Sequence, residues 1–242
     1  VMEGVTGTQF EDRILHFQCG KFKDEMDAGR LLDAGMLNRM VLYVTALMEV
    51  KSSMGIIVAA PTAGSCGALP GTCLAAGEAM GWSDETMARG MLAAGLIGIF
   101  VTARSSFAAE VTGCQGETGV GAAMAAAALV DMNGGSVNQA LAAASMALQN
   151  TLGLVCDPVA NRVEVPCLGR NISAAANALT SANVALADFA EVIPLDEVIA
   201  THNTIGRSLP RELRCTCLGG LSITESAKTI ETQLARKRTS VE

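Results

Sequence analysis

Eight cysteines are distributed along this 242-residue chain, and thiolates are the ligands that soft metal centres prefer. No two cysteines have the Cys-x-x-Cys spacing that is typical of zinc ribbons and thioredoxin-type redox pairs. Cys215 and Cys217 form a close pair, which alone is a weak indication of a metal site. Cys73 follows Pro70 in a helix-like pattern, and we expect it to be a buried thiol. The remaining cysteines are Cys19, Cys66, Cys114, Cys156 and Cys167.

Three cysteines lie where Gly or Pro marks a turn of the chain. Cys114 stands in the sequence Gly-Cys-Gln-Gly-Glu, Cys156 precedes Asp-Pro, and Cys167 follows Pro. These thiols are therefore expected on loops, where functional residues are usually held by a rigid scaffold. Three thiolates on separate loops would suit a [4Fe–4S] cluster with one iron left open. From the residues alone, three unrelated core or surface thiols remain the simpler interpretation.

A Gly-rich loop, residues 61–67, precedes a helix-like segment and offers hydroxyl groups and backbone N–H groups. Such a loop suits the carboxylate of a small substrate, although a turn without a ligand fits the pattern equally well. A lysine and a serine upstream of the loop are secondary candidates. The candidate substrate-binding residues are Thr62, Ser65, Gly64, Lys51 and Ser53.

No catalytic base can be assigned from the sequence. The two histidines, His16 and His202, fall on helix-like segments away from the loops, so a surface or capping role is the preferred interpretation. Glu117 is a possible base, but a role as partner of a helix dipole is preferred. Pyridoxal phosphate chemistry is disfavoured because, of the five lysines, only Lys51 lies near a candidate loop and none adjoins a phosphate-binding Gly loop.

The elements that must position these loops are predicted to be helices. Apolar residues recur at spacings of three and four, and Ser136 with Gln139 forms a capping-box pattern. Val163–Val165 is the best candidate for a short strand. We expect an all-α fold: a compact helical catalytic domain over 1–225 with Gly/Pro-rich cysteine-bearing loops, then a polar tail over 226–242. The predicted helices cover 37–48, 83–102, 119–132, 136–150, 172–187 and 194–206, with Asp33 or a neighbour capping the first and Gly206 ending the last.

Composition excludes several classes of protein. Half of the residues are apolar and 17% are charged, which is too apolar for a disordered chain, while only 3% are aromatic, so small aliphatic side chains must fill the core. A net charge of −7 argues against a nucleic-acid partner, and the basic residues 236–238 are expected to be a solvated end.

Membrane insertion is not expected either. The most apolar stretch, 91–103, lies between two arginines and is shorter than the roughly 20 residues of a membrane span. The first residues show no secretory leader, so we expect a cytoplasmic protein whose cysteines are thiols or metal ligands.

Four ordered segments, 59–65, 113–117, 154–159 and 164–167, closely resemble the iron–sulfur L-serine dehydratases of the α-chain type. The separations of 42 residues between Cys114 and Cys156, and 11 between Cys156 and Cys167, are also similar to those of that family's cluster ligands. The resemblance implies that these three cysteines hold a [4Fe–4S] cluster. It also implies that the chain is an L-serine ammonia-lyase, which converts L-serine to pyruvate and ammonia with the open iron acting as a Lewis acid.

The resemblance further implies a β-type region, either a separate chain or a fused domain, within a homo- or hetero-oligomer. This chain departs from some single-chain relatives because it has no cysteine after Cys217, and residues 222–225 differ from the Ala-rich pattern of relatives. Two alternatives stay open. One is a lyase acting on threonine or cysteine, and the other is a non-catalytic, cluster-bearing sensor.

Overall fold

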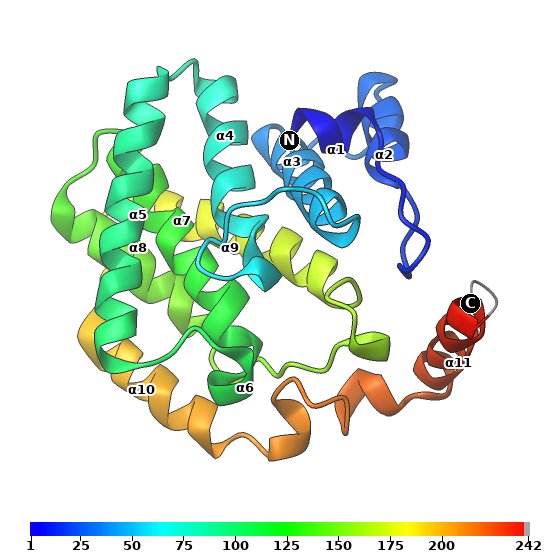
Figure 1. Ribbon diagram of the computed structural model, residues 1–242. Helices are drawn as coiled ribbons and strands as arrows, with labels where there is room; N and C mark the ends of the chain where they lie inside the picture. The colour runs from blue at the N-terminus through cyan, green and yellow to red at the C-terminus, as the bar shows by residue number, and fades with distance from the viewer. Residues whose placement is uncertain (240–242) are drawn as a thin grey trace.

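The computed structural model describes residues 1–239, and within this range the protein is all-α, as predicted (Figure 1). Eleven α-helices are joined by loops that contain five short 3-10 or π-helical turns, and no β-strand occurs in the described chain. The helices are α1 Met2–Thr6, α2 Cys19–Asp27, α3 Met36–Ser52, α4 Ala68–Met80, α5 Asp84–Arg104, α6 Ala109–Thr112, α7 Val120–Met132, α8 Val137–Gln149, α9 Cys167–Leu186, α10 Leu195–Ser208 and α11 Glu225–Thr239.

Helix α7 forms the centre of the core. Every residue of α7 except Asp131 is buried, and the helix packs against α5, α8, α9 and α4 (Figure 1). Six of its 13 residues are alanine, so neighbouring helices approach it closely. At Gly90 of α5 an added Cβ would lie only 2.4 Å from Cγ of Met132, which shows how tight this contact is. The small aliphatic residues noted in the sequence thus build a close-packed helical core.

Two of the predicted helix starts are confirmed in atomic detail. The hydroxyl of Ser83 accepts a hydrogen bond from the N–H of Thr86, 3.2 Å away, at the start of α5. Ser136 and Gln139 form the reciprocal capping box at the start of α8. By contrast, the N-cap of α3 is Gly35, a neighbour of Asp33, and no side chain caps this helix, so Asp33 itself does not form the cap. The Asp33 carboxylate instead accepts a hydrogen bond from the N–H of Gly35.

Two predicted helix boundaries are also wrong. Helix α9 begins at Cys167, five residues before the predicted start at 172. Helix α10 continues through Gly206 to Ser208. The reason for glycine at 206 is packing, because an added Cβ there would lie 2.6 Å from Nε2 of Gln115. This glycine therefore permits a close helix contact and does not end the helix.

The predicted strand at Val163–Val165 does not form. Glu164 turns its carboxylate to the N–H groups of Ile14 and Leu15, 2.8–3.1 Å away, and its carbonyl oxygen accepts from Leu168 in the first turn of α9. The segment is therefore a lead-in to α9, bonded to the N-terminal loop. The closest approach to a sheet in residues 1–239 is one isolated parallel bridge between Cys156 and Arg214.

Most of the predicted polar tail forms helix α11, and residues 240–242 lie outside the described part of the chain. Ala227 and Leu234 are buried, so α11 has a small apolar side. In Figure 1 this helix lies at the edge of the molecule, apart from the central helices. The division of the chain at residue 225 stays a prediction.

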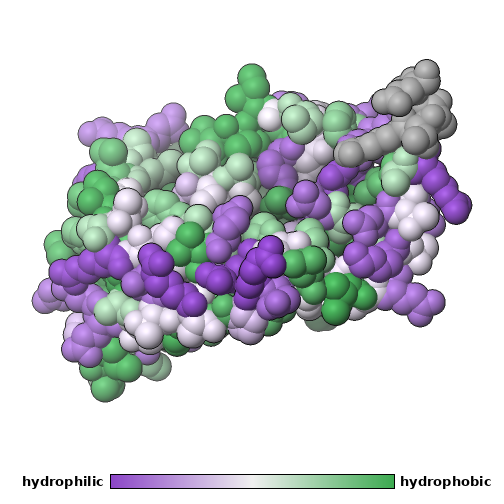
Figure 2. All heavy atoms as spheres, turned by 60° about the horizontal axis from the view of Figure 1, so that its bottom comes forward, coloured by the Kyte–Doolittle hydropathy of each residue, from purple (hydrophilic) through white to green (hydrophobic). Residues whose placement is uncertain are grey.

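Helix α5 is the one described helix that is long and apolar enough to cross a membrane, by length and composition alone. This is weak evidence, because core helices of water-soluble proteins pass the same test. Its outer face does expose Leu92, Leu96 and Ile99, with 73%, 55% and 61% of each residue accessible. On the face shown in Figure 2, hydrophobic and hydrophilic residues are interspersed.

Candidate metal centre

Cys114 lies at the start of a π-helical turn, Gln115–Gly119, that leads directly into α7. Such turns are rare in proteins as a whole, but those that occur are often found at functional sites. The residue before it, Gly113, has a φ of 74° and sits so close to the loop at Leu154 that an added Cβ would lie 2.7 Å from the Leu154 carbonyl oxygen. The N–H of Gln115 donates to the same oxygen over 3.1 Å. The Cys114 turn is thereby held against the loop that carries Cys156.

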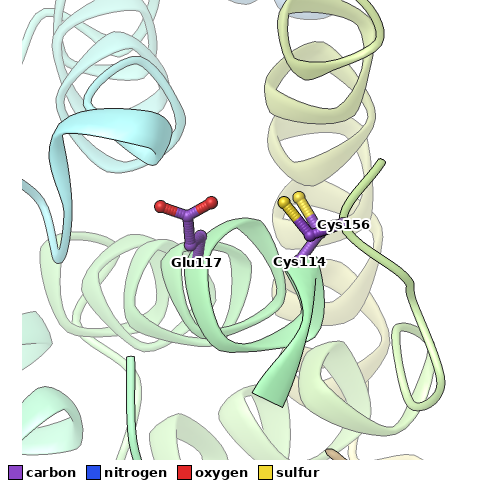
Figure 3. Close-up of side chains that lie close together, drawn as sticks. All are labelled: Cys114, Glu117 and Cys156. Atoms are coloured by element: carbon purple, nitrogen blue, oxygen red, sulfur yellow. The ribbon is translucent and has the colours of Figure 1, made fainter. Parts of the chain in front are cut away.

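Two predicted ligands and an acidic side chain converge at this point. A sulfur of Cys114, a sulfur of Cys156 and a carboxylate oxygen of Glu117 all lie within 4.8 Å of one another. Figure 3 shows Cys114 and Glu117 on one turn, both directed to the same side, with the sulfur of Cys156 next to that of Cys114. Both cysteines are buried. Thiolates select soft metals such as zinc or iron in iron–sulfur clusters, so this group can hold a metal centre.

The third predicted ligand, Cys167, lies nearby without joining this tight group. It is the first residue of α9 and is 3% exposed. Burial, followed by the negative charge of Cys114, raises the pKa of the Cys167 thiol to about 12. The structure thus places Cys167 within electrostatic reach of Cys114, and its role as a ligand stays a prediction.

A fourth thiol, Cys215, packs against the cluster that contains Cys156, and no role was expected for it from the sequence. Hydrogen bonding with Cys114 and Cys215 raises the pKa of Cys156, and hydrogen bonding with Cys156 lowers the pKa of each of those two neighbours. The backbones are also joined, because the N–H of Cys215 donates to the Cys156 carbonyl over 2.8 Å. The only signal in the sequence was the Cys-x-Cys pair, which does not indicate a partner 59 residues earlier.

Two cationic side chains border the thiols. Arg170 lies within electrostatic reach of Cys114, donates to Oδ1 of Asp157 over 2.7 Å, and donates to the carbonyl of Val155 over 2.8 Å. Lys51 donates to the carbonyl of Val163 and is largely buried, and this burial lowers its pKa. A neighbouring cation stabilises a thiolate, so this setting favours metal ligation. Arg170 was missed at the sequence level because no motif marks it.

The predicted substrate loop lies against Glu117. Thr62 donates its hydroxyl to Oε1 of Glu117 over 2.7 Å, and the Ser65 hydroxyl lies 3.2 Å from that of Thr62. At Gly64 an added Cβ would lie 2.4 Å from the same carboxylate oxygen, so only glycine permits this approach. Burial raises the pKa of Glu117. The structure therefore brings the loop and the thiols to opposite sides of one carboxyl group.

Lys51 and Gly64 also line a cavity of about 440 Å³, together with Arg162 and Glu164. Its size suits a small molecule, and of its two cationic side chains Arg162 is already paired with Asp12 over 2.7 Å, which leaves Lys51 as the candidate for binding a carboxylate. Ser53, at the C-terminal end of α3, instead accepts a hydrogen bond from Arg13 and is thereby tied to the N-terminal loop.

The preferred surface or capping role of His202 is wrong. His202 is completely buried in α10, with Nδ1 2.8 Å from the hydroxyl of Ser105, and burial lowers its pKa. Its carbonyl accepts from the side chain of Gln115 over 2.7 Å, so it supports the turn that carries Cys114. His16 lies exposed in a loop, not on the helix that the sequence suggested.

Comparisons with known proteins agree with this arrangement of motifs. A family model described as "Serine dehydratase alpha chain" matches residues 1–222. The chain is 39% identical over 234 residues to the probable L-serine dehydratase, alpha chain, of Bacillus subtilis (strain 168), covering 97% of this chain and 78% of that protein. It is 43% identical over 204 residues to the L-serine dehydratase, alpha chain, of Peptoniphilus asaccharolyticus, covering 84% and 70%. It is 38% identical over 184 residues to the L-serine dehydratase TdcG of Escherichia coli (strain K12), covering 75% of this chain and 40% of that protein.

Proposed function

The chain belongs to the serine dehydratase alpha chain family, and from this premise we propose that it is the catalytic chain of an L-serine ammonia-lyase. The reaction removes water from L-serine, and the resulting enamine tautomerises and is hydrolysed to pyruvate and ammonia. The observation that carries the proposal is the buried group of Cys114, Cys156 and Glu117, which lies at the family's cysteine motifs and beside the Gly-rich loop.

The donor set fits an iron–sulfur cluster. The thiol group is buried and bordered by Arg170, and thiolates rather than imidazoles or several carboxylates dominate it. We assign Cys114, Cys156 and Cys167 as the residues that would hold a [4Fe–4S] cluster. When bound, such a cluster supplies a Lewis-acidic iron for the hydroxyl group that leaves serine.

Substrate binding is assigned to the cavity that Lys51 and Gly64 line, because Lys51 also lies within electrostatic reach of Cys167. Lys51 provides a positive charge there, and Gly64 allows the loop to lie close to Glu117. The serine carboxylate would bind near Lys51 and the loop hydroxyls of Thr62 and Ser65. Ser53 remains a secondary candidate, because its hydroxyl already accepts a hydrogen bond from Arg13.

Glu117 is the residue best placed to take the proton from Cα of serine. Its carboxylate lies between the thiols and Thr62, and burial raises its pKa towards the range in which a general base works well. Thr62 donates to Oε1, so the proton would be held at Oε2. This assignment replaces the preferred structural role of Glu117 with a role in proton transfer.

The proposal includes a β-type partner and a cytoplasmic location. The relatives from Bacillus subtilis and Peptoniphilus asaccharolyticus are named as alpha chains, which implies a second chain. The chain also covers only 40% of the E. coli relative, which leaves room for a fused region there. A lyase acting on threonine or cysteine would use the same residues, and a sensor would keep the thiols without turnover.

One experiment separates these functions. The chain is purified without oxygen, its iron, sulfide and visible absorption are measured, and pyruvate formation from serine, threonine and cysteine is compared with and without a β chain. We expect about four irons per chain, as [4Fe–4S] requires, and preferential turnover of serine. Iron binding without turnover of any of the three, even with the β chain, would contradict a lyase.

A further inference from the structure

Asn171 joins two segments that the proposed function uses, the Gly-rich loop over 61–67 and the start of α9 at Cys167. Its side-chain nitrogen donates to the carbonyl of Gly64 over 3.0 Å and to the carbonyl of Cys167 over 2.9 Å. Its side-chain oxygen accepts from the N–H of Ala68, the first residue of α4, over 3.1 Å. One amide group therefore bonds the loop, the helix that follows the loop, and the backbone of a predicted metal ligand.

The burial of Asn171 indicates that these bonds keep it in place. The residue is 0% exposed, and a buried amide costs free energy unless its polar atoms are bonded. Asparagine is also a poor residue for a helix interior, since its side chain competes for backbone groups. Both N–H groups of the Asn171 amide are used, one on the loop and one on Cys167. What the amide contributes is therefore a fixed connection between the loop and Cys167.

The Gly-rich loop is thereby anchored to both parts of the candidate metal centre. Thr62 bonds Glu117, which lies within 4.8 Å of two thiols, and Asn171 bonds Gly64 to the backbone of Cys167. In the proposed function, serine binds the loop with its carboxylate while its hydroxyl group reaches the metal. Misplacement by about 1 Å can lower a rate about 100-fold, so the separation of loop and thiols has to be fixed.

We propose that Asn171 is a positioning residue for the dehydration, whose amide holds the Gly-rich loop in register with Cys167 so that serine meets the loop and the metal at the same time. Asn171 acts through the backbone of Gly64 and Cys167 and touches neither substrate nor metal itself. The proposal rests on the proposed function, because it presupposes that the loop binds the substrate and that the thiols hold the metal.

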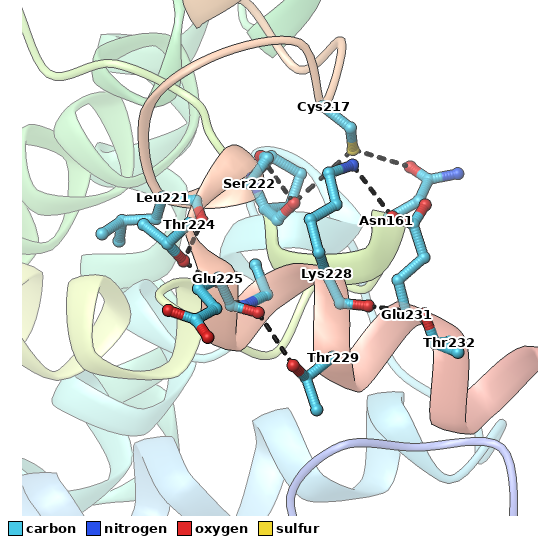
Figure 4. Close-up of polar contacts among 12 residues, drawn as sticks. Asn161, Cys217, Leu221, Ser222, Thr224, Glu225, Lys228, Thr229, Glu231 and Thr232 are labelled. Atoms are coloured by element: carbon cyan, nitrogen blue, oxygen red, sulfur yellow. Dashed lines mark hydrogen bonds and ion pairs between the residues drawn. The ribbon is translucent and has the colours of Figure 1, made fainter.

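The test compares Asn171→Ala with two control variants that also lose a side-chain bond to a backbone carbonyl. Asn177, six residues later in α9, donates to the carbonyl of Ala147 over 2.8 Å. Ser222 is buried and donates to the carbonyl of Pro158, in the loop between α8 and α9, over 2.9 Å (Figure 4). Neither of these bonds involves the Gly-rich loop, so Asn177→Ala and Ser222→Ala measure the general effect of losing such a bond.

Each protein is prepared without oxygen and combined with the β chain, and its iron content and free energy of unfolding are measured. The kinetic comparison is kcat/KM for L-serine against the inhibition constant Ki of L-alanine, which has the carboxylate and amino group of serine but no hydroxyl group. Hydrogen exchange of residues 61–68 in the same preparations reports the order of the loop independently of turnover.

We expect Asn171→Ala to lower kcat/KM for serine about 10- to 100-fold and to change Ki for alanine less than about twofold, because alanine needs the loop but not its register with the metal. Exchange of residues 61–68 should become faster in this variant. Asn177→Ala and Ser222→Ala should match wild type in both constants and in the exchange of 61–68.

A structural role alone would weaken serine and alanine by the same factor. That result, or unchanged exchange of residues 61–68 in Asn171→Ala, would overturn the proposal. If Asn171→Ala does not fold, Asn171→Ser replaces it, because a serine hydroxyl can still bond the carbonyl four residues earlier but is too short to reach Gly64. A wild-type protein that holds iron but turns over no serine would overturn the proposed function and this role with it, so the two failures are distinguishable.

Discussion

Thr62 donates its hydroxyl to Oε1 of Glu117 across 2.7 Å, although the two residues are 55 positions apart in the sequence. The loop that we expected to bind a substrate carboxylate therefore already binds a carboxylate of the chain itself. Because Glu117 also lies within 4.8 Å of two thiols, this hydrogen bond connects the loop with the candidate metal centre. A change at Thr62 thus tests both elements together.

Replacing Thr62 with valine should weaken substrate binding while leaving the iron content unchanged. Valine nearly preserves the volume but removes the hydroxyl, so the loop loses its bond to Glu117, and with it the positioning of the carboxylate and loop between which serine would bind. A tenfold rise in KM would correspond to about 1.4 kcal/mol of binding free energy if chemistry is slow. Ser65→Ala is the companion variant. If both variants keep the wild-type kcat/KM for serine, the loop is only a structural turn and Lys51 becomes the main candidate.

Replacing Cys114, Cys156 or Cys167 with alanine should abolish the visible absorption of the cluster and the lyase activity together. Cys73 is the control, because it is fully buried in α4 and lies within the main core. Cys73→Ala should cost some stability and leave iron content nearly intact. Full iron content and turnover in anaerobically prepared Cys156→Ala would show that the ligand assignment is wrong.

Replacing Arg170 with methionine should destabilise the apo protein by about 3–5 kcal/mol, because it leaves Asp157 as a buried carboxylate without its cation. The double variant Arg170→Met, Asp157→Asn should recover part of this loss, since it removes the uncompensated charge as well. Urea unfolding of wild type, both single variants and the double variant measures the coupling. If the losses of unfolding free energy in the two single variants add up to the loss in the double variant, the interaction between Arg170 and Asp157 does not stabilise the protein.

Stability should fall as pH falls because of His202. Its pKa is lowered by burial, and Nε2 has no hydrogen-bond partner, so protonation places an unpartnered charge in the core. Below about pH 6.5 the unfolded chain then binds more protons than the folded chain. The stability that depends on neutral His202 is therefore complete above that pH, and it is lost as the pH falls through the lower pKa that His202 has in the folded chain. His202→Gln should reduce the decrease in Tm between about pH 7.5 and about pH 5.5. The exposed His16→Gln is the control, and an unchanged decrease in His202→Gln would contradict the account.

The purified chain alone should show weak or no turnover of serine, and a separately expressed β chain should restore it. The reason is that the relatives of similar length are named as alpha chains. Pyruvate formation is measured against increasing β chain at fixed α chain. A chain that reaches full activity alone would remove the need for the partner.

The sequence alone determined the helical architecture. Helical spacing of apolar residues and the capping residues Ser83 and Ser136 act over a few positions, so these local rules located α3, α5, α7 and α8. The cysteine motifs and their separations also indicated the family, which the comparisons confirmed. The end of α10 was missed because packing decided it, as the contact of Gly206 with Gln115 shows.

Only the tertiary structure decided which side chains meet. Cys215 lies beside Cys156, Glu117 accepts from Thr62, and His202 is buried against Ser105, although each pair is separated by more than 50 residues. Local propensity carries no information about such pairs, because they depend on how the helices around α7 pack and on where the loops between them are anchored. The sequence determined that thiols and a Gly-rich loop were available for chemistry. The packing of the helices decided that Glu117 lies between them and that Cys215 joins the thiols.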